Sequence, residues 1–371
     1  SEVAGRVGGV YALNTLGNIT GSALCGLVMV PLLGIKLTIE TAVVLNILTS
    51  ISILMALGSK RRLHRFANVA IAASLGIYAL LAPDWNRHLL TAGAFRYHSS
   101  SPGASVGNFY RSAHEREFVY YREGVSTTVS VERDGETLML RVNGKVDASN
   151  ESDMNTQYLL AHLPMLLHPD PARVLVIGAG SGATCGAALS HNELERMVCV
   201  EISPGVAEAS RLFEGINRRY WEDPRTELVI DDGRNFLFRD DSRWDVITSE
   251  PSNPWIAGIG NLYTEQFYTD CARRLAPGGL ICQWIHLYEM DESVLRTILI
   301  TFTRTFPHAL GFSSVENNDL LLIGSLEPIE MDFGNIKNRM AQTEVATDLE
   351  RIGISYLYTL LTTQIFDESG I

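Results

Sequence analysis

One short segment constrains the fold of this chain more than any other: an apolar stretch that runs directly into a glycine-rich turn. Residues 174–177 are Val-Leu-Val-Ile, and residues 178–182 are Gly-Ala-Gly-Ser-Gly. A strand followed by glycines and then by a helix allows the backbone to approach a ligand closely. The candidate ligand-binding residues of this turn are Gly178, Gly180, Ser181 and Gly182. By itself, the turn is also compatible with a simple tight loop.

Two further acids follow the next predicted strands. Glu201 ends a strand about 20 residues after the turn, where a carboxylate can bind both hydroxyls of a ribose. Asp232, followed by Gly233, is placed to accept a hydrogen bond from an adenine amino group. The structural alternative for Asp231 and Asp232 is capping of a helix over 234–238. All three loops are expected at the carboxyl edge of one sheet, where open α/β sheets bind ligands.

Apolar strands alternate with helical stretches in the second half of the chain, which predicts a parallel sheet. The five expected parallel strands are residues 173–177, 197–202, 227–230, 244–249 and 279–285. A helix over 292–306 and an antiparallel pair, 309–312 and 319–323, would complete a seven-stranded sheet. We therefore predict that residues 169–330 form a Rossmann-like α/β fold of the S-adenosylmethionine-dependent methyltransferase type, followed by a helical segment over 331–371.

The glycine turn differs from the dinucleotide-binding pattern Gly-x-Gly-x-x-Gly, because position 183 is Ala and no second half of a dinucleotide fold follows. One glycine turn, one ribose acid and one adenine acid suit a donor with a single adenosine and a sulfonium arm. The predicted donor is S-adenosylmethionine or its decarboxylated form.

Ahead of this domain, residues 108–168 are predicted to form a small antiparallel β-domain. Strand-like patterns cover residues 118–121, 127–131 and 137–142. Residues 133–136, Arg-Asp-Gly-Glu, have the composition of a hairpin turn between the last two strands.

Three apolar runs lie at the start of the chain, at residues 7–34, 37–57 and 67–83. About 20 apolar residues span a bilayer as a helix, so residues 1–84 are predicted to be transmembrane helices of a larger bundle, with 85–107 as a linker. A signal peptide is the alternative for the first run, but a basic start and a cleavage pattern are missing. The positive-inside rule places the basic loop at 60–65 in the cytosol, which puts the following domain outside if the third run crosses. We still expect a cytoplasmic domain, because nucleotide-type donors are cytosolic.

The charge balance restricts the class of partner. The formal net charge is −12, and most acids follow the apolar runs. A nucleic-acid partner is disfavoured because phosphates need a basic surface, whereas a small amine substrate fits. The five cysteines show no metal-ligand spacing, so no metal site is predicted.

Residues 118–283 resemble the polyamine aminopropyltransferases, the spermidine synthase family, and in particular its membrane-fused bacterial relatives. The segments that carry the resemblance are residues 153–164, 174–182, 200–202, 223–225, 231–234, 263–268 and 275–279. The resemblance implies a β-domain leaning over a methyltransferase-like sheet, decarboxylated S-adenosylmethionine as the donor and a small amine, a diamine or polyamine, as the acceptor. It further implies a multi-pass protein of the bacterial inner membrane, in contact with lipid, and is compatible with a homodimer.

The chain departs from this family at three places in the site. The family turn Gly-Gly-Gly-Asp-Gly is Gly-Ala-Gly-Ser-Gly here, without the acid that faces the aminopropyl end of the donor. The family motif Asp-Ser-x-Asp-Pro begins here with Glu250, which would take the proton of the attacking amine, and Asn253 replaces its second acid. The family's Tyr-His-Glu is Thr-Gln-Tyr at 156–158. The residues expected to line the acceptor slot are Gln157, Asn253, Trp255 and Tyr263.

Two other functions fit the sequence. The segment Asn-Pro-Trp at 253–255 resembles the Asn/Asp-Pro-Pro-aromatic turn of amino-methyltransferases, which favours methyl transfer to a small amine, although the second proline is absent. The missing family acids instead favour a non-catalytic, nucleoside-binding sensor domain attached to the membrane helices. The structural alternatives are helix capping for Glu250 and core packing for Trp255 and Tyr263.

Overall fold

The computed structural model describes residues 2–56, 62–93, 107, 111, 114–151, 153–256, 258–314 and 319–367. Lys60 and Arg61 of the predicted basic loop, and residues 94–106 of the predicted linker, lie outside this set. The chain divides into two compact units. Unit 1 consists of Ser1–Glu115, Tyr121–Val129 and Asn143–Lys145, and unit 2 consists of Arg116–Tyr120, Ser130–Val142 and Val146–Ile371.

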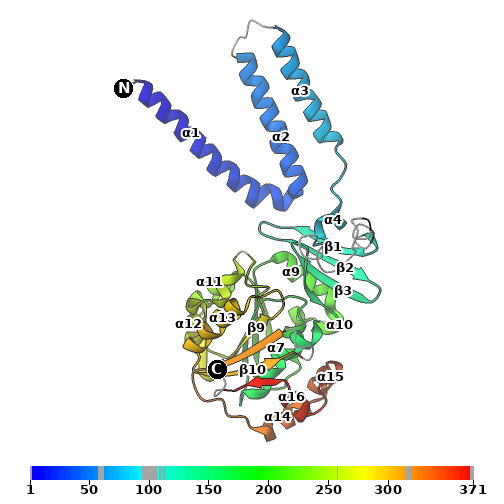
Figure 1. Ribbon diagram of the computed structural model, residues 1–371, viewed down its shortest axis with the longest axis vertical. Coiled ribbons are helices and arrows are strands. Elements are labelled where there is room, and N and C mark those ends of the chain that lie inside the picture. The colour runs from blue at the N-terminus through cyan, green and yellow to red at the C-terminus, as the bar shows by residue number, and fades with distance from the viewer. Residues whose placement is uncertain are drawn as a thin grey trace. The chain divides into compact units, whose positions relative to one another are not determined.

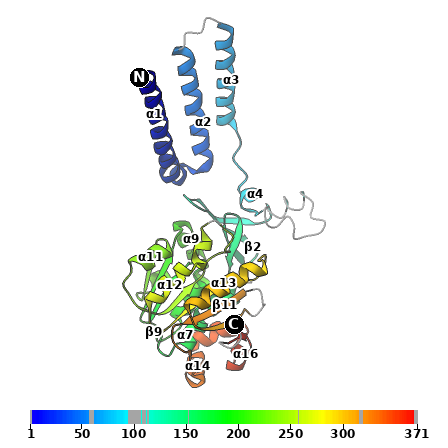
Figure 2. The ribbon, with the colours of Figure 1, turned by 60° about the vertical axis from the view of Figure 1, so that its left-hand side comes forward.

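Unit 1 begins with long apolar helices. They are α1 (Glu2–Leu24), the π-helical turn η1 (Cys25–Met29), α2 (Val30–Ala56) and α3 (Arg62–Leu81). Gly34 has a φ of 81°, outside the helical range, so α2 bends between the first and second apolar runs. Helices α2 and α3 lie side by side (Figures 1 and 2).

One stretch of the described helices, Gly5–Ile53, is long and apolar enough to cross a membrane, and Val69–Tyr78 forms a shorter apolar helix. Large apolar side chains on α1, such as Leu13 and Leu16, are exposed. These features support one candidate membrane segment, and crossing by several helices stays a prediction. A short helix, α4 (Arg87–Thr91), lies in the segment for which the sequence predicts only a linker; it begins where the Asn86 side chain accepts a hydrogen bond from the Leu89 amide at 3.3 Å.

The predicted antiparallel sheet is present, with one strand more than expected. Its strands are β1 (Glu117–Glu123), β2 (Thr128–Asp134), β3 (Thr137–Val142) and β4 (Lys145–Ser149), in the order β1-β2-β3-β4. Gly135, with a φ of 60°, makes the turn between β2 and β3. Asn143 and Gly144 also have positive φ and reverse the chain into β4, whose short polar sequence has no strand signal.

Unit 2 contains a larger mixed sheet, which confirms the Rossmann-like α/β class. Its strands are β5 (Arg173–Ile177), β6 (Arg196–Glu201), β7 (Thr226–Ile230), β8 (Trp244–Ser249), β9 (Leu275–His286), β10 (His308–Ser313), β11 (Asp319–Ser325) and β12 (Gln364–Phe366). The strand order is β12-β10-β11-β9-β8-β5-β6-β7. The neighbours β9, β8, β5, β6 and β7 pair in parallel. The pairs β9–β11, β11–β10 and β10–β12 are antiparallel. The carboxyl ends of β5 to β8 therefore meet at one edge.

Strand β12 is a correction to the sequence prediction, which has seven strands and a helical segment over 331–371. Residues 364–366 pair with β10 and add an eighth strand at that edge of the sheet. A side chain at Gly311 would collide with the ring of Phe366. This strand therefore forms through its pairing with β10 and the packing of Phe366 against Gly311. Its three residues show no sequence pattern that predicts a strand.

Helices cover both faces of the large sheet. One core lies under α7 (Met154–Leu167), α8 (Ala183–Leu189), α14 (Phe333–Met340), α15 (Thr343–Arg351) and α16 (Leu357–Leu361). The other lies under α11 (Gly233–Arg239), α12 (Glu265–Arg274) and α13 (Glu292–Thr305). Shorter helices join these elements: α9 (Pro204–Ala209), α10 (Glu214–Asn217), η2 (Ser210–Phe213), η3 (Tyr220–Glu222) and η4 (Ile259–Tyr263). Burial on both faces explains why β5 and β6 are almost uniformly apolar, whereas β7, at the edge of the sheet, is only partly buried.

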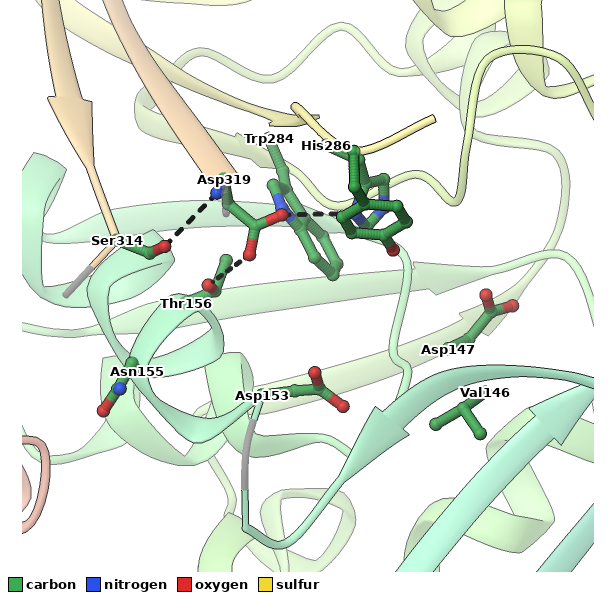
Figure 3. A pocket seen from close by; sticks show the side chains of 10 residues that line it. Val146, Asp147, Asp153, Asn155, Thr156, Trp284, His286, Ser314 and Asp319 are labelled. Carbon is green, nitrogen blue, oxygen red and sulfur yellow. Dashed lines mark hydrogen bonds and ion pairs between the residues drawn. The ribbon is translucent and has the colours of Figure 1, made fainter. Parts of the chain in front are cut away.

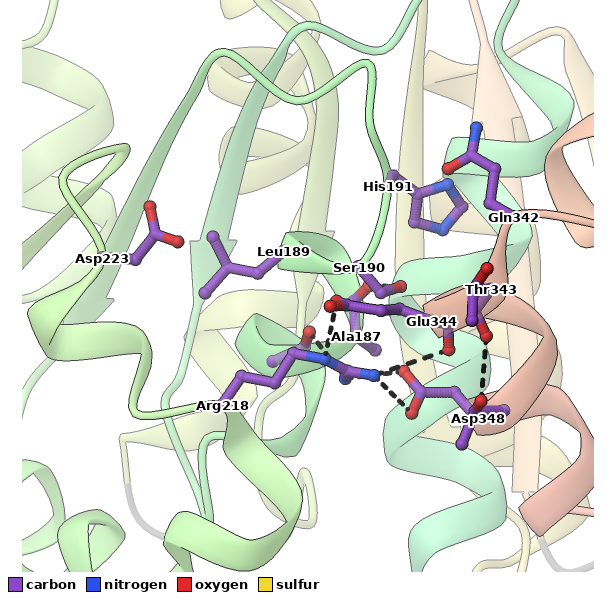
Figure 4. A network of polar contacts seen from close by, with 12 residues as sticks. Ala187, Leu189, Ser190, His191, Arg218, Asp223, Gln342, Thr343, Glu344 and Asp348 are labelled. Carbon is purple, nitrogen blue, oxygen red and sulfur yellow. Dashed lines mark hydrogen bonds and ion pairs between the residues drawn. The ribbon is translucent and has the colours of Figure 1, made fainter.

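An ion pair between Arg218 and Asp348 attaches the C-terminal helix α15 to the residues between α10 and β7 (Figure 4). Arg218 donates to both carboxylate oxygens of Asp348 on α15, at 2.7 and 2.8 Å. Nε2 of His162 lies 3.5 Å from Oδ2 of the same carboxylate, and Nδ1 of His162 lies 2.9 Å from Nε2 of His191. Burial lowers the pKa of both histidines, so this pair is neutral in the core.

Candidate active site

The glycine turn after β5 has left-handed backbone at all three glycines. The φ angles are 101° at Gly178, 50° at Gly180 and 81° at Gly182. A Cβ atom on Gly178 would lie 2.6 Å from the carbonyl oxygen of Glu250, and one on Gly182 would lie 2.5 Å from the ring of Tyr220. The turn therefore needs glycine both for its backbone conformation and for its close packing.

Glu201, at the end of β6, is buried beside this turn. Its Oε2 accepts a hydrogen bond from the Ala179 amide at 2.9 Å, and its Oε1 accepts one from the Ser203 amide at 2.7 Å. Burial raises the pKa of Glu201, although these backbone hydrogen bonds act in the opposite direction. The next side chain, Ile202, is 58% exposed and offers an apolar surface at the same edge.

The acids after β7 are engaged at the start of α11. Oδ1 of Asp232 accepts hydrogen bonds from the amides of Arg234 and Asn235, at 2.8 and 3.4 Å, so Asp232 is the helix cap. Asp231 forms an ion pair with Arg239 on the same helix. A Cβ atom on Gly233 would lie 2.5 Å from Ile177, which lets the start of α11 pack directly against β5.

Glu250 follows β8 and is buried against the glycine turn. Its amide donates to the carbonyl of Ile177 at 2.9 Å, and its Oε1 lies 3.3 Å from the position of a Cβ atom on Gly180. Burial raises the pKa of Glu250 to about 8, and the nearby charges of Glu201, Asp147 and Asp153 act in the same direction, opposed by a hydrogen bond from Thr184. A carboxyl group with this pKa exchanges a proton readily near neutral pH.

Gln157 and Ser181, predicted for the acceptor and donor parts of the site, lie in direct contact. The Ser181 hydroxyl donates to Oε1 of Gln157. Nε2 of Gln157 in turn donates to the carbonyl of Ser149 on β4 at 3.2 Å. Both side chains are fully buried, so this pair connects the glycine turn to β4 from the protein interior.

The other predicted acceptor residues fall into two environments. Asn253 is fully buried, and within the described part of the chain its amide nitrogen and oxygen have no hydrogen-bond partner. Tyr263 is buried, and its hydroxyl lies 3.2 Å from the carbonyl oxygen of Ser252 and 3.3 Å from that of Trp284. Trp255 is 48% exposed. The structure thus places Asn253 and Tyr263 in the interior and Trp255 at the surface.

A cavity of about 180 Å³ in unit 2 (Figure 3) has a lining that includes none of the predicted acceptor residues Gln157, Asn253, Trp255 and Tyr263. It is lined by Val146, Asp147, Asp153, Asn155, Thr156, Trp284, His286, Tyr288, Ser314 and Asp319. Four separate segments contribute to it: β4, the start of α7, the end of β9 and the region around the start of β11. Sequence reasoning missed this cavity, because no local pattern connects segments so far apart in the chain.

Asp319 is the acid on one wall of this cavity. Its Oδ2 accepts a hydrogen bond from the Thr156 hydroxyl at 2.7 Å, and its Oδ1 lies 3.2 Å from Nδ1 of His286 (Figure 3). Burial acts to raise the pKa of Asp319, but the contacts with His286 and Thr156 outweigh it and lower the pKa. Asp319 is therefore a carboxylate at neutral pH. The rings of Trp284 and His286, 4.1 Å apart, lie next to it.

Asp147 connects the cavity to the loop that carries Glu250. Its Oδ1 accepts a hydrogen bond from the Ser252 hydroxyl at 2.8 Å. Among the described residues, no group of three or more His, Cys, Asp or Glu side chains has the arrangement of a metal site. The site therefore combines a glycine turn, a buried carboxyl group of raised pKa and an acidic, aromatic cavity.

Comparison with known proteins shows that the central part of this site, including the glycine turn and Glu250, is similar to one family. Residues 154–315 match the family described as the spermine/spermidine synthase domain. The chain is 33% identical over 154 residues to a spermidine synthase of Dictyostelium discoideum, covering 40% of this chain and 54% of that protein. It is 36% identical over 155 residues to a polyamine aminopropyltransferase of Thermococcus kodakarensis, again covering 40% and 54%. The chain spans about half the length of the curated relatives it matches.

Solved structures show the same fold. A spermidine synthase crystallised with the transition-state analogue AdoDATO has a TM-score of 0.54 at 22% identity, covering 64% of this chain and 88% of that one. A spermidine synthase from Thermotoga maritima has a TM-score of 0.53 at 21% identity, with the same coverage. Residues 154–315 are thus similar to the spermine/spermidine synthase domain, and the larger part of unit 2 shares the fold of solved spermidine synthases.

Proposed function

We propose that this chain is an aminopropyltransferase of polyamine biosynthesis, which moves an aminopropyl group from decarboxylated S-adenosylmethionine to the nitrogen of a small amine. The observation that carries the proposal is the position of Glu250. Its buried carboxyl group lies against the glycine turn on one side, and the loop that follows it is joined to the acidic cavity through Ser252 and Asp147. The family of residues 154–315 supports the same reaction.

The donor nucleoside would bind at the carboxyl edge of β5, β6 and β7. The backbone of the turn at 178–182 would approach the donor, Glu201 would bind the ribose hydroxyls, and Asp232 with Gly233 would lie at the adenine. Exposed Ile202 and Ile230, which stand at the ends of neighbouring strands, supply an apolar surface for a flat base. One of the solved spermidine synthases of this fold was crystallised with a transition-state analogue, AdoDATO.

The acceptor would enter the cavity as an ammonium ion. The carboxylate of Asp319 and the aromatic rings of Trp284 and Tyr288 attract cations and pack against methylene groups. The volume of about 180 Å³ is many times the roughly 10–15 Å³ that one water molecule needs on the same measure, so the cavity has room for a short diamine. Asn253, buried with its amide atoms unpaired among the described residues, would offer polar atoms to the reacting amine.

The reaction needs the ammonium to lose one proton before its nitrogen can attack. Glu250 would accept that proton, the nitrogen would form a bond to the carbon next to the sulfonium sulfur, and the carbon–sulfur bond would break. The electron pair of that bond returns to sulfur, which leaves as a neutral thioether, methylthioadenosine. Alignment of the two reactants in a water-poor site supplies the remaining acceleration.

We further propose that the helices of unit 1 hold the protein in a bacterial inner membrane, with the catalytic part on the cytoplasmic side. The exposed apolar side chains of α1 and α2 support lipid contact. Alkaline carbonate extraction tests the membrane attachment, because a peripheral protein is released and an integral one is retained. Labelling of single cysteines introduced at exposed positions tests the orientation.

The function is tested by incubating the purified full chain with either decarboxylated or intact S-adenosylmethionine and a series of amines. Methylthioadenosine is expected with the decarboxylated donor and a diamine, and its formation should disappear in Glu250→Gln while the variant still binds methylthioadenosine. S-adenosylhomocysteine from the intact donor would instead establish a methyltransferase. Nucleoside binding with neither product would establish a sensor domain and overturn the proposal.

A further inference from the structure

Strand β4 contacts both the glycine turn and the loop after β8. The Cβ atom of Ala148 lies 3.8 Å from the position of a Cβ atom on Gly180, and Oδ1 of Asp147 accepts the hydrogen bond from Ser252 at 2.8 Å. The adjacent Ser149 carbonyl accepts the hydrogen bond from Gln157. Three successive residues of one short strand therefore touch three different parts of the site.

We propose that Asp147 is a positioning residue for Glu250: it fixes the loop after β8 through its hydrogen bond with Ser252, and its negative charge acts on the Glu250 carboxyl group. This inference rests on the proposed function, because it assigns Asp147 a role in the proton transfer of that reaction. The two parts of the role are separable. The hydrogen bond to Ser252 acts on geometry, and the charge acts on protonation.

The groups that surround Glu250 make the charge of Asp147 effective. Glu201 comes from β6, Asp147 from β4 and Asp153 from the residue before α7, and each of these carboxylates opposes ionisation of Glu250. Thr184 on α8 contributes a neutral hydroxyl, which favours ionisation. The thiols of Cys199 on β6 and Cys282 on β9 also lie near Glu250, and their pKa values are raised, so they are neutral.

Removal of one negative neighbour therefore changes the pH at which Glu250 becomes a base. With the Asp147 charge present, Glu250 keeps its proton to a higher pH, where more of the acceptor amine has already lost its own proton. Without that charge, Glu250 ionises at lower pH. The charge of Asp147 thus brings the pKa of Glu250 closer to the pKa of the acceptor ammonium.

Two variants of the full chain separate charge from geometry. Asp147→Asn keeps an oxygen that accepts from Ser252 but removes the charge, so the acidic limb of the kcat/KM profile should move to lower pH by about 0.5–1 unit. Ser252→Ala keeps the charge but removes the hydrogen bond, so kcat should fall several-fold with the limb in its original position. Asp134→Asn, in an exposed position at the end of β2, makes the same chemical change in the same sheet and should alter neither quantity.

A spectroscopic titration keeps this test independent of turnover. In chain labelled at the glutamate carboxyl carbons, the resonance that disappears in Glu250→Gln belongs to Glu250, and its midpoint should fall in Asp147→Asn but not in Asp134→Asn. A lowered midpoint in a protein without transferase activity would refute the proposed function and leave only the electrostatic effect of Asp147 on Glu250. An unchanged midpoint together with an unchanged acidic limb would overturn the role of Asp147.

Discussion

Oε1 of Glu250 lies 3.3 Å from the position that a Cβ atom on Gly180 would occupy. The proposed base therefore rests directly on the turn that would hold the donor. Because Gly180 also has a φ of 50°, the contact depends on glycine twice, once for space and once for backbone conformation. This relationship places the base within reach of a donor bound on the turn.

Gly180→Ala should reduce transfer strongly, because the added methyl group displaces the Glu250 carboxyl group. Its backbone strain should also lower the free energy of unfolding by about 1 kcal/mol. The matched control is Gly135→Ala, which has a similar φ of 60° but no other atom within 4 Å of the new methyl group. Thermal unfolding and initial rates measure both effects. Equal loss of activity in the two variants would show that strain alone, and not Glu250, is responsible.

Glu250→Gln should make the protein more stable at alkaline pH. The pKa of this carboxyl is about 8 in the folded chain against 4.5 for the ordinary group. The stability that neutral Glu250 contributes is complete below pH 4.5 and is lost as the pH rises through about 8, because the unfolded chain releases the proton more easily. The glutamine variant avoids this loss, so its advantage should be roughly 2–5 kcal/mol near pH 9.

Denaturant unfolding of both proteins at about pH 5 and about pH 9 measures this difference. The two curves should nearly coincide at the acidic pH, where Glu250 carries its proton in the folded chain. A constant difference at both pH values would mean that packing, and not ionisation, separates the two proteins.

Glu201→Ala should weaken the binding of methylthioadenosine by about 1.5–3 kcal/mol, the usual contribution of hydrogen bonds to a charged group. It should also lower stability, because the amides of Ala179 and Ser203 lose their acceptor. Calorimetric titration measures the affinity. Glu227→Ala, on the adjacent strand with a largely exposed side chain, is the control and should bind normally. Full affinity in Glu201→Ala would remove Glu201 from the ribose site.

Asp319→Asn should raise the KM for the amine about tenfold and leave donor affinity unchanged, because it removes a carboxylate from the acceptor cavity. Steady-state kinetics with varied amine concentration measure the KM for the amine. Titration with methylthioadenosine measures the affinity of the donor site. Asn155→Ala changes a neutral side chain of the same cavity, and its effect on KM should be less than about twofold. If donor affinity falls as far as amine affinity in Asp319→Asn, the residue maintains the fold and not the acceptor site.

Arg218→Ala should destabilise the protein by about 3 kcal/mol, because it leaves the carboxylate of Asp348 buried without its main partner. Its neighbour supplies a matched control. Arg219 has nearly the same left-handed backbone and an exposed ion pair with Glu222, so Arg219→Ala should lose less than about 1 kcal/mol. Chemical denaturation compares them. Similar losses in both variants would show that the contact in Figure 4 does not hold α15 in place.

The sequence predicted elements well where a local pattern carries the information. Strands β5 and β8 begin and end at the predicted residues, because short apolar runs bounded by polar loops are typical of strands buried on both faces. The alternation of these strands with helices predicted their parallel pairing, and therefore the meeting of Glu201 and Glu250 at one edge. Strand β4, strand β12 and helix α4 escaped prediction, because they are short and their sequences are polar or ambiguous.

By itself, the sequence determined the class of fold, the glycine turn and the order of acids along the parallel strands, since each depends on neighbours within one turn or strand. Only the tertiary structure decided which groups surround these acids and how deeply the acids are buried. The raised pKa of Glu250 comes from burial and from the charges of Glu201, Asp147 and Asp153, and the cavity lined by β4 is also lined by Asp319, more than 150 residues further along the chain. Burial and charge proximity are sums over nonlocal contacts, so a linear pattern contains neither quantity.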